Sequence, residues 1–428
     1  MASRRFASSR SSKPSAPRPN ARPLPPLART LAELEQPSLE DEARLLAATR
    51  AVWELAPWKR WFEDQIFIVR EPQEGTLCFV SVTGAGGENF AVIVYRGADT
   101  YFRLLDFIER ASATEMPDWA SDFGKGQAGQ EMPADFGAFL AAMSETDVDP
   151  TELLSLSQLQ LNFETRKELD APDVERLKRH NYIAKGRGFP TFRSFVPGFL
   201  PWWISAGEAR MLATCLEQLL DLTGRPSFDP NSLEPKESGR DRPVHELLAR
   251  VCTGKDGQDE WSDTRLKVSP GEAPYAIDLE PDDEVLERIA ALPKGKMPLE
   301  VEFVSVPMPV GGEGERPYFP TMLLVGQDGQ VTGSETLPCG LPSPYSITPL
   351  VNGVLSLLAS QPKRPSALHF SSIELGILPA IAGLAGIPAQ FVDELPTLDP
   401  AIEALMDAME SGELFGEDED DALPPRSG

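Results

Sequence analysis

Residues 299–306, LEVEFVSV, and residues 321–336, TMLLVGQDGQVTGSET, decide the fold of the last third of the chain. The first run alternates apolar and polar residues, which is the period of a strand with one buried face. In the second run, Asp328-Gly329 lies between two strand-like halves, and an Asp-Gly pair favours a two-residue hairpin turn. The two runs therefore predict a meander of three antiparallel strands.

Helices and strands alternate after this meander. The expected elements, in order, are a helix from Ser346 or Thr348 to Ala359, a strand at Ala367–Phe370, a helix at Ile373–Ala385, a strand at Ala389–Val392 and a helix from Asp399 to Met409. Strands joined by crossover helices pair in parallel, with helices on the faces of the sheet. Three strands followed by helix, strand, helix, strand and helix is the element order of the ribonuclease H-like fold. We therefore expect an α/β domain of this kind at residues 296–411.

Carboxylates decide whether such a domain could be catalytic. Phosphodiester cleavage would need acids around a pair of divalent ions such as magnesium, and the acids in reach are Glu302, Glu374 and Asp393. The first helix holds no acid between residues 346 and 360, so we expect no cofactor and keep this metal site as the alternative. Asp393 and Glu394 also follow the last parallel strand, where open α/β sheets bind ligands. We expect them to serve either a binding site or the turn before the last helix.

The N-terminal half predicts an α+β domain at residues 38–225. Ser38 and Asp41 form a capping-box pattern at the start of a helix. Three runs rich in Ile, Val and Phe follow, separated by turn residues. They predict a three-stranded meander at Gln65–Arg70, Thr76–Val82 and Phe90–Tyr95.

Residues 188–204, GFPTFRSFVPGFLPWWI, are the densest aromatic stretch of the chain. Their prolines exclude a continuous helix and a central strand, so we expect an extended, bent segment. The rings either pack against the core of the domain or form a platform for a base, a sugar or a peptide. The residues of such a binding surface would be Phe192, Arg193, Phe195, Trp202 and Trp203.

Composition shifts divide the rest of the chain. Residues 226–243 are rich in Pro, Ser and charge, and we expect a linker there. Residues 244–295 are expected to form a hairpin and a connecting segment, because two strand-like runs lie at 245–253 and 261–268. Residues 1–37 predict a disordered basic tail, and residues 412–428 a disordered acidic tail.

Charge limits the classes of function. The net charge is −26, although residues 1–32 hold seven basic residues and no acid, so the body of the chain is strongly acidic. Such a body repels phosphate backbones, and we do not expect it to bind nucleic acid. The sequence lacks a long apolar run, a secretory signal and paired cysteine spacing. We expect a cytoplasmic protein outside the membrane, with a protein or a small ligand as partner and no predicted oligomeric state.

Two parts of the sequence resemble known domain families. FPTFRSF at 189–195, with Pro197-Gly198, PWW at 201–203 and Glu208-Ala209, resembles the central motif of an uncharacterised bacterial family. The segment 378–395, which ends in the string DELP at 393–396, resembles the domain usually fused to it. The resemblance implies two fused domains over most of residues 40–410 in a bacterial cytoplasm, and it implies no site residue.

The sequence contains none of the motifs of common catalytic sites that would indicate an enzyme. It has no Gly-x-Ser-x-Gly, no His-Glu-x-x-His and no phosphate-binding Lys motif, and its three histidines lie on different expected elements. We therefore expect a non-catalytic binding or scaffold protein of the bacterial cytoplasm. The alternative is a metal-dependent hydrolase or nuclease that uses the carboxylates of the C-terminal domain.

Overall fold

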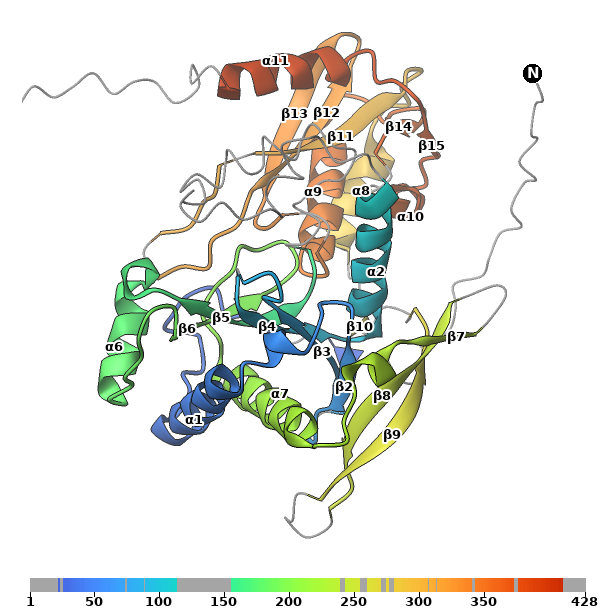
Figure 1. Ribbon diagram of the computed structural model, residues 1–428. Coiled ribbons are helices and arrows are strands. Elements are labelled where there is room, and N and C mark those ends of the chain that lie inside the picture. The colour runs from blue at the N-terminus through green and yellow to red at the C-terminus, as the bar shows by residue number, and fades with distance from the viewer. Residues whose placement is uncertain are drawn as a thin grey trace, which may run out of the picture. The chain divides into compact units, whose positions relative to one another are not determined.

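The chain forms two compact units that together are mixed α/β. The computed structural model describes residues 22–23, 26–73, 75–87, 89–113, 155–238, 243–254, 260–270, 275–276, 281–306, 308–312, 314–340, 343–372 and 376–410. The N-terminal domain comprises residues 1–276 and the loop 311–317, and the C-terminal domain comprises residues 277–310 and 318–428. Figure 1 labels the elements of both domains.

A sheet of eight described strands forms the centre of the N-terminal domain, with the order β6-β5-β4-β3-β2-β8-β7 and β9 paired to β8. Its strands are β2 (Phe67–Arg70), β3 (Leu77–Thr83), β4 (Ala91–Arg96), β5 (Gln158–Glu164), β6 (Phe189–Phe195), β7 (Lys236–Ser238), β8 (Val244–Cys252) and β9 (Trp261–Val268). The predicted three-stranded meander is confirmed as β2, β3 and β4. All pairs are antiparallel except β2 with β8. A short parallel pair, β1 (Arg22–Pro23) with β10 (Tyr275–Ala276), lies apart from this sheet.

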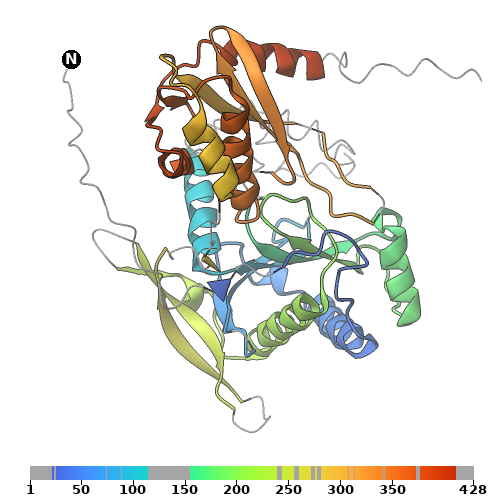
Figure 2. The same ribbon diagram turned by 180° about the vertical axis from the view of Figure 1, so that it is seen from behind.

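Helices cover both faces of the sheet, as both views show (Figure 1, Figure 2). Helices α1 (Leu39–Leu55) and α7 (Ala206–Gly224) pack on one face, and α2 (Ala98–Ala113) packs on the other. Successive strand residues therefore enter opposite cores: Phe67 joins the core under α1 and α7, and Ile68 joins the core under α2. The predicted capping box of Ser38 and Asp41 begins α1.

The aromatic stretch forms an edge strand and then a bend. β6 pairs only with β5 among the described strands, so Pro190, which cannot donate a backbone hydrogen bond, lies where none is needed. The chain then turns at Gly198, whose φ is +86°, and returns so that Trp202 pairs with Ser194. As expected, the stretch forms neither a continuous helix nor a central strand. The first half of the extended, bent segment is the edge strand β6.

Three expected segments differ from the structure. The hairpin β8–β9, expected in a separate segment at 244–295, extends the first sheet, because Leu247 and Ala249 are fully buried beside β2. β7 lies within the expected linker 226–243 and pairs with β8. Residues 26–37, expected in the disordered tail 1–37, pack on the domain through buried Leu34. The rest of that tail, apart from Arg22 and Pro23, and the tail 412–428 lie outside the described residues.

The C-terminal sheet has the order β13-β12-β11-β14-β15. Its strands are β11 (Leu299–Ser305), β12 (Thr321–Gln327), β13 (Gln330–Leu337), β14 (Leu368–Phe370) and β15 (Ala389–Phe391), and its helices are α8 (Asp283–Ala291), α9 (Ile347–Ser360), α10 (Leu378–Leu384) and α11 (Leu398–Glu410). β11, β12 and β13 are antiparallel neighbours, and β11, β14 and β15 are parallel. The β12–β13 turn has positive φ at both Asp328 and Gly329, as the Asp-Gly signal predicts.

Candidate functional site

The rings of the aromatic stretch are mostly buried by the chain itself. Phe192 joins the core under α1 and α7 with 1% of its surface exposed, and Phe195 and Trp202 are also buried. The guanidinium carbon of Arg316, in the loop 311–317, lies 4.6 Å from the ring centre of Trp202. The guanidinium carbon of Arg193 lies 4.4 Å from the ring centre of half-buried Trp203. The aromatic stretch, one of whose expected roles was an open binding platform, is therefore largely covered by other groups of this chain.

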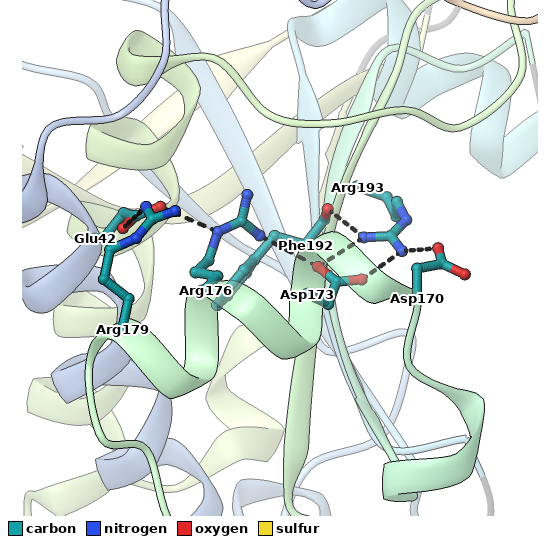
Figure 3. Close-up of polar contacts among 7 residues, drawn as sticks. All are labelled: Glu42, Asp170, Asp173, Arg176, Arg179, Phe192 and Arg193. Atoms are coloured by element: carbon teal, nitrogen blue, oxygen red, sulfur yellow. Dashed lines mark hydrogen bonds and ion pairs between the residues drawn. The ribbon is translucent and has the colours of Figure 1, made fainter. Parts of the chain in front are cut away.

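Arg193 belongs to a charged network that holds α6 (Ala171–Arg179) against β6 (Figure 3). Its two terminal nitrogens donate to the two carboxylate oxygens of buried Asp173, at 2.7 and 3.4 Å. One of these nitrogens also donates to Asp170 at 2.8 Å, and the other to the carbonyl oxygen of Phe192 at 3.0 Å. The Arg193 side chain is thus fully engaged in positioning α6.

Glu42 of α1 extends the same network from the other side (Figure 3). Its buried carboxylate accepts hydrogen bonds from Arg176 Nε at 3.2 Å and from Arg179 at 3.1 Å, and it lies 2.7 Å from His180 Nε2. Arg176 also donates to Asp173 at 3.2 Å. Carboxylates and guanidinium groups alternate across the network, so it neutralises its own charge and fixes α6 between α1 and β6.

The chain reverses at the end of α6 through a motif that builds a pocket. Asn181 has φ of +48°, a left-handed conformation that Asn tolerates better than most residues, and its N–H donates to the carbonyl of Lys178. The N–H of Tyr182 donates to the carbonyl of Leu177 at 2.8 Å. These two bonds form a Schellman motif, which places Tyr182 back against the last turn of the helix.

A pocket of about 230 Å³ lies between α6, this turn and the start of β6. Most of its lining is apolar, and two exposed cations and one amide complete it; the lining residues are Arg166, Leu169, Val174, Leu177, Lys178, Asn181, Tyr182, Ile183 and Phe189. Ile183 is 81% exposed. The pocket therefore offers an apolar surface with positive charge beside it.

The segment that forms the pocket has a net charge opposite in sign to that of the chain. Residues 166–187 contain seven Lys or Arg and four Asp or Glu, whereas the whole chain has a net charge of −26. The side chains of Arg176 and Arg179 are held by Glu42, but the side chains of Arg166 and Lys178 form no hydrogen bond or ion pair within the described chain. These two cations are the groups of the pocket that can meet an anionic ligand.

Two carboxylates close to the pocket have shifted pKa values. Hydrogen bonds from the backbone and side chain of Thr165, which outweigh a smaller opposing effect of burial, hold the pKa of Glu168 below its ordinary value. Burial and the neighbouring Glu168 raise the pKa of Glu164. Burial also raises the pKa of Tyr182, although Arg50 lies over its ring. The lowered pKa favours the ionised form of Glu168, whose carboxylate accepts the backbone N–H of Thr165, the N-terminal cap of the short turn Arg166–Glu168.

Two carboxylates on β11, Glu300 and the predicted Glu302, serve as hydrogen-bond acceptors inside the C-terminal domain. Glu300 accepts the backbone N–H groups of Thr397 and Leu398, at 2.8 and 2.9 Å, and so caps the start of α11. Glu302 accepts from the hydroxyl of Ser371 at 2.6 Å and from the N–H of Phe303 at 3.0 Å. Both acids are buried, because they face α11 rather than solvent.

Glu300→Ala is expected to lower the free energy of unfolding by about 2–3 kcal/mol, because two buried N–H groups lose their acceptor. Urea denaturation measures the change. Glu394→Ala is the matched control, since Glu394 is exposed, and it should alter stability by less than about 0.5 kcal/mol. Equal effects of the two substitutions would contradict the capping role of Glu300.

Among the described residues of this domain, Asp393 and Glu394 do not form a metal site with Glu302. Asp393 and Glu394 are exposed after β15, and Glu374 lies outside the described residues. Within the ranges that the structure describes, no group of three His, Cys, Asp or Glu side chains is arranged to hold a metal ion. In the same ranges, no helix combines the length and the apolar character needed to cross a membrane.

Sequence reasoning missed the pocket on α6. Its apolar residues are scattered over three elements, and only the fold brings Leu169, Leu177 and Phe189 together. One signal was present in the sequence, namely the basic cluster at 166–187 within an acidic chain. Isolated Leu and Val residues on a short charged helix are otherwise typical of ordinary core packing.

Two family models match the chain. One is described as a domain of unknown function (DUF7309) and matches residues 43–122 and 129–248; the other is described as a domain of unknown function (DUF6930) and matches residues 285–406. No curated protein and no solved structure matches the chain. The first match runs through the expected linker into β8. The expectation of two fused uncharacterised domains is confirmed, because the two models match successive parts of the chain and both describe domains of unknown function.

Proposed function

We propose that the chain is a non-catalytic binding or scaffold protein of the bacterial cytoplasm, and that its partner inserts an apolar group into the α6 pocket. The observation that carries this proposal is the combination of an apolar pocket with two cations, Arg166 and Lys178, that are not neutralised within the described chain. An anionic group beside the apolar one would contact these cations. The partner is therefore an acidic protein segment or a small organic acid.

The dimensions of the pocket favour a single apolar group. Its volume of about 230 Å³ is below the range of about 300–1,000 Å³ that encloses drug-sized ligands. Burial of one large apolar side chain contributes about 1.5–3 kcal/mol, and an exposed ion pair adds at most about 1 kcal/mol. Because association also has an entropic cost, we expect a small acid to bind with a dissociation constant on the order of millimolar.

For the C-terminal domain we propose the ribonuclease H-like arrangement. The strand order β13-β12-β11-β14-β15, antiparallel over the first three strands and parallel over the last three, supports it. The alternative function is a magnesium-dependent hydrolase or nuclease with Glu302, Glu374 and Asp393, and the described members of this set, Glu302 and Asp393, do not support it. Both oxygens of Glu302 accept hydrogen bonds from the chain, so metal binding would first have to break them.

A titration with 2-naphthoate, an aromatic carboxylate, tests the proposed binding. The double variant Arg166→Glu/Lys178→Glu should raise the dissociation constant of the full-length chain for this probe at least about fivefold, because repulsion replaces attraction. Lys59→Glu/Lys267→Glu changes the net charge equally at two exposed cations that do not line the pocket. It should leave binding within about twofold. Equal weakening in both variants, or no binding to the wild type, would remove the pocket as a binding site.

A further inference from the structure

Most basic residues of the C-terminal domain lie in two short loops. The domain contains 23 Asp or Glu and only six Lys or Arg. The six are Arg288, Lys294, Lys296, Lys363, Arg364 and Arg426. Four of them belong to the loop 293–297, which precedes β11, and the loop 361–366, which precedes β14. This concentration gives the two loops a charge opposite to that of the rest of the domain.

Backbone contacts hold the two loops side by side. Lys294 pairs with Arg364 in a parallel bridge, and the N–H of Gly295 donates to the carbonyl of Arg364 at 2.7 Å. Gly295 allows this close approach, because a Cβ atom there would lie 2.9 Å from the Arg364 carbonyl oxygen and 3.4 Å from Cβ of Lys363. Lys363 therefore lies against the loop at the point between Lys294 and Lys296, and the three Lys side chains start from one small area.

Within the described part of the domain, no acidic side chain forms an ion pair with these cations. Lys294, Lys296 and Lys363 are exposed, and their side chains form no hydrogen bond or ion pair there. The Arg364 side chain is fixed in place, since its Nη2 donates to the two carbonyl oxygens that follow α10, at 2.8 and 2.6 Å. Like charges held close together repel one another, and an anion beside them relieves this repulsion.

We propose that this basic patch, defined by Lys294, Lys296, Lys363 and Arg364, binds a short acidic segment of a partner protein. A long polyanion such as nucleic acid would extend beyond the patch over an acidic domain and be repelled there. A short acidic segment avoids this repulsion, and its apolar side chains could contact Met297, which is 45% exposed in the same loop. The patch is separate from the α6 pocket and does not depend on the function proposed for it.

Fluorescence anisotropy of fluorescein-labelled hexaglutamate, titrated with the full-length chain at low ionic strength, tests the proposal. The triple variant Lys294→Glu/Lys296→Glu/Lys363→Glu should raise the dissociation constant at least about tenfold, because repulsion replaces attraction at three positions. All three side chains are exposed and none is bonded within the described chain, so the variant should fold as the wild type does.

The matched control is Lys59→Glu/Lys236→Glu/Lys267→Glu, which makes the same change of charge at three exposed cations of the N-terminal domain. It should leave the dissociation constant within about twofold of the wild type. Equal weakening in both triple variants, or no binding to the wild type, would overturn the proposal. If only Arg166→Glu/Lys178→Glu weakens binding, the peptide binds at the α6 pocket, which supports the proposed function and overturns the basic patch.

Carbodiimide coupling locates the contact without relying on a variant. The reagent joins a carboxylate of N-acetylated hexaglutamate to a Lys amine in contact with it, and mass spectrometry identifies the amide bond. The proposal expects coupling at Lys294, Lys296 or Lys363, and coupling confined to other Lys residues would contradict it. A short DNA duplex serves as competitor. If the duplex binds the patch more tightly than the peptide does, the partner is a nucleic acid and the proposal fails.

Discussion

Asp173→Ala is expected to lower the free energy of unfolding by about 3–5 kcal/mol, the cost of removing one partner of a buried ion pair. Asp173 is 1% exposed and accepts from both Arg193 and Arg176. The side chains of these arginines are only 17% and 12% exposed, so solvent cannot replace the carboxylate. Arg176 would keep Glu42 as a partner, whereas Arg193 would keep only the exposed Asp170 and the Phe192 carbonyl.

Urea denaturation of the full-length chain measures this loss, followed by a signal of the N-terminal domain such as Trp fluorescence. Asp170→Ala is the matched control, because Asp170 accepts from the same Arg193 nitrogen but is 63% exposed. Removal of the Asp170 carboxylate should lower the free energy of unfolding by less than about 1 kcal/mol. Similar costs for the two substitutions would show that burial of the carboxylate does not determine the stability of this network.

Glu208→Gln is expected to lower the free energy of unfolding by about 3–5 kcal/mol at neutral pH. Glu208 lies in the first turn of α7, and its side chain is 16% exposed. One carboxylate oxygen accepts from Arg96 at 2.5 Å and from the hydroxyl of Ser194 at 2.6 Å, and the other accepts from the N–H of Ser205 at 2.8 Å. The neutral amide would leave the Arg96 charge, itself mostly buried, without its counter-ion.

The effect of Glu208 should depend on pH. Burial alone would raise its pKa, but Arg96 and the hydrogen bonds from Ser194 and Ser205 outweigh burial, and the folded-state pKa lies below the ordinary value of 4.5. A carboxyl group with a lowered folded-state pKa stabilises the protein above its unfolded-state pKa and loses this effect as the pH falls through the folded-state pKa. The stability difference between wild type and Glu208→Gln should therefore be full at pH 7 and shrink below about pH 4.5.

Urea titrations at several pH values check this dependence. Glu217→Gln is the matched control, since Glu217 lies on the same helix and pairs with Arg44 at 2.6 Å, but about two fifths of each side chain is exposed. The Glu217→Gln substitution should lower the free energy of unfolding by less than about 1 kcal/mol. A stability difference for Glu208→Gln that stays constant down to pH 3 would contradict the lowered pKa.

Local patterns in the sequence predicted most secondary-structure elements. The meander β2–β4, the Asp328-Gly329 turn and the capping box at Ser38 all depend on neighbours within a few residues, so one sequence shows them. The sequence did not predict the parallel pairing of β2 with β8, because this pairing joins residues about 180 positions apart. Such pairing is specified by the shared core of both strands rather than by a turn.

The candidate site was harder to predict than the secondary structure, because it is formed by contacts between residues far apart in the sequence. The sequence marked Trp202 as a binding residue, but Arg316 from a loop more than 100 residues later lies over its ring. It named Glu302 as a metal ligand only in the alternative function, and the hydroxyl of Ser371 donates to its carboxylate. The sequence alone does not show whether an aromatic or acidic side chain contacts a ligand or another part of the chain. The α6 pocket required the fold to bring its three elements together.

The most direct test of the central claim is the ratio of two dissociation constants for 2-naphthoate. One is measured for Arg166→Glu/Lys178→Glu and the other for Lys59→Glu/Lys267→Glu, both in the full-length chain at the same ionic strength, because salt screens such contacts. Binding at the α6 pocket predicts a ratio of at least about 2.5, with the control within about twofold of the wild type. A ratio of about 1 would contradict the claim that this pocket is the binding site.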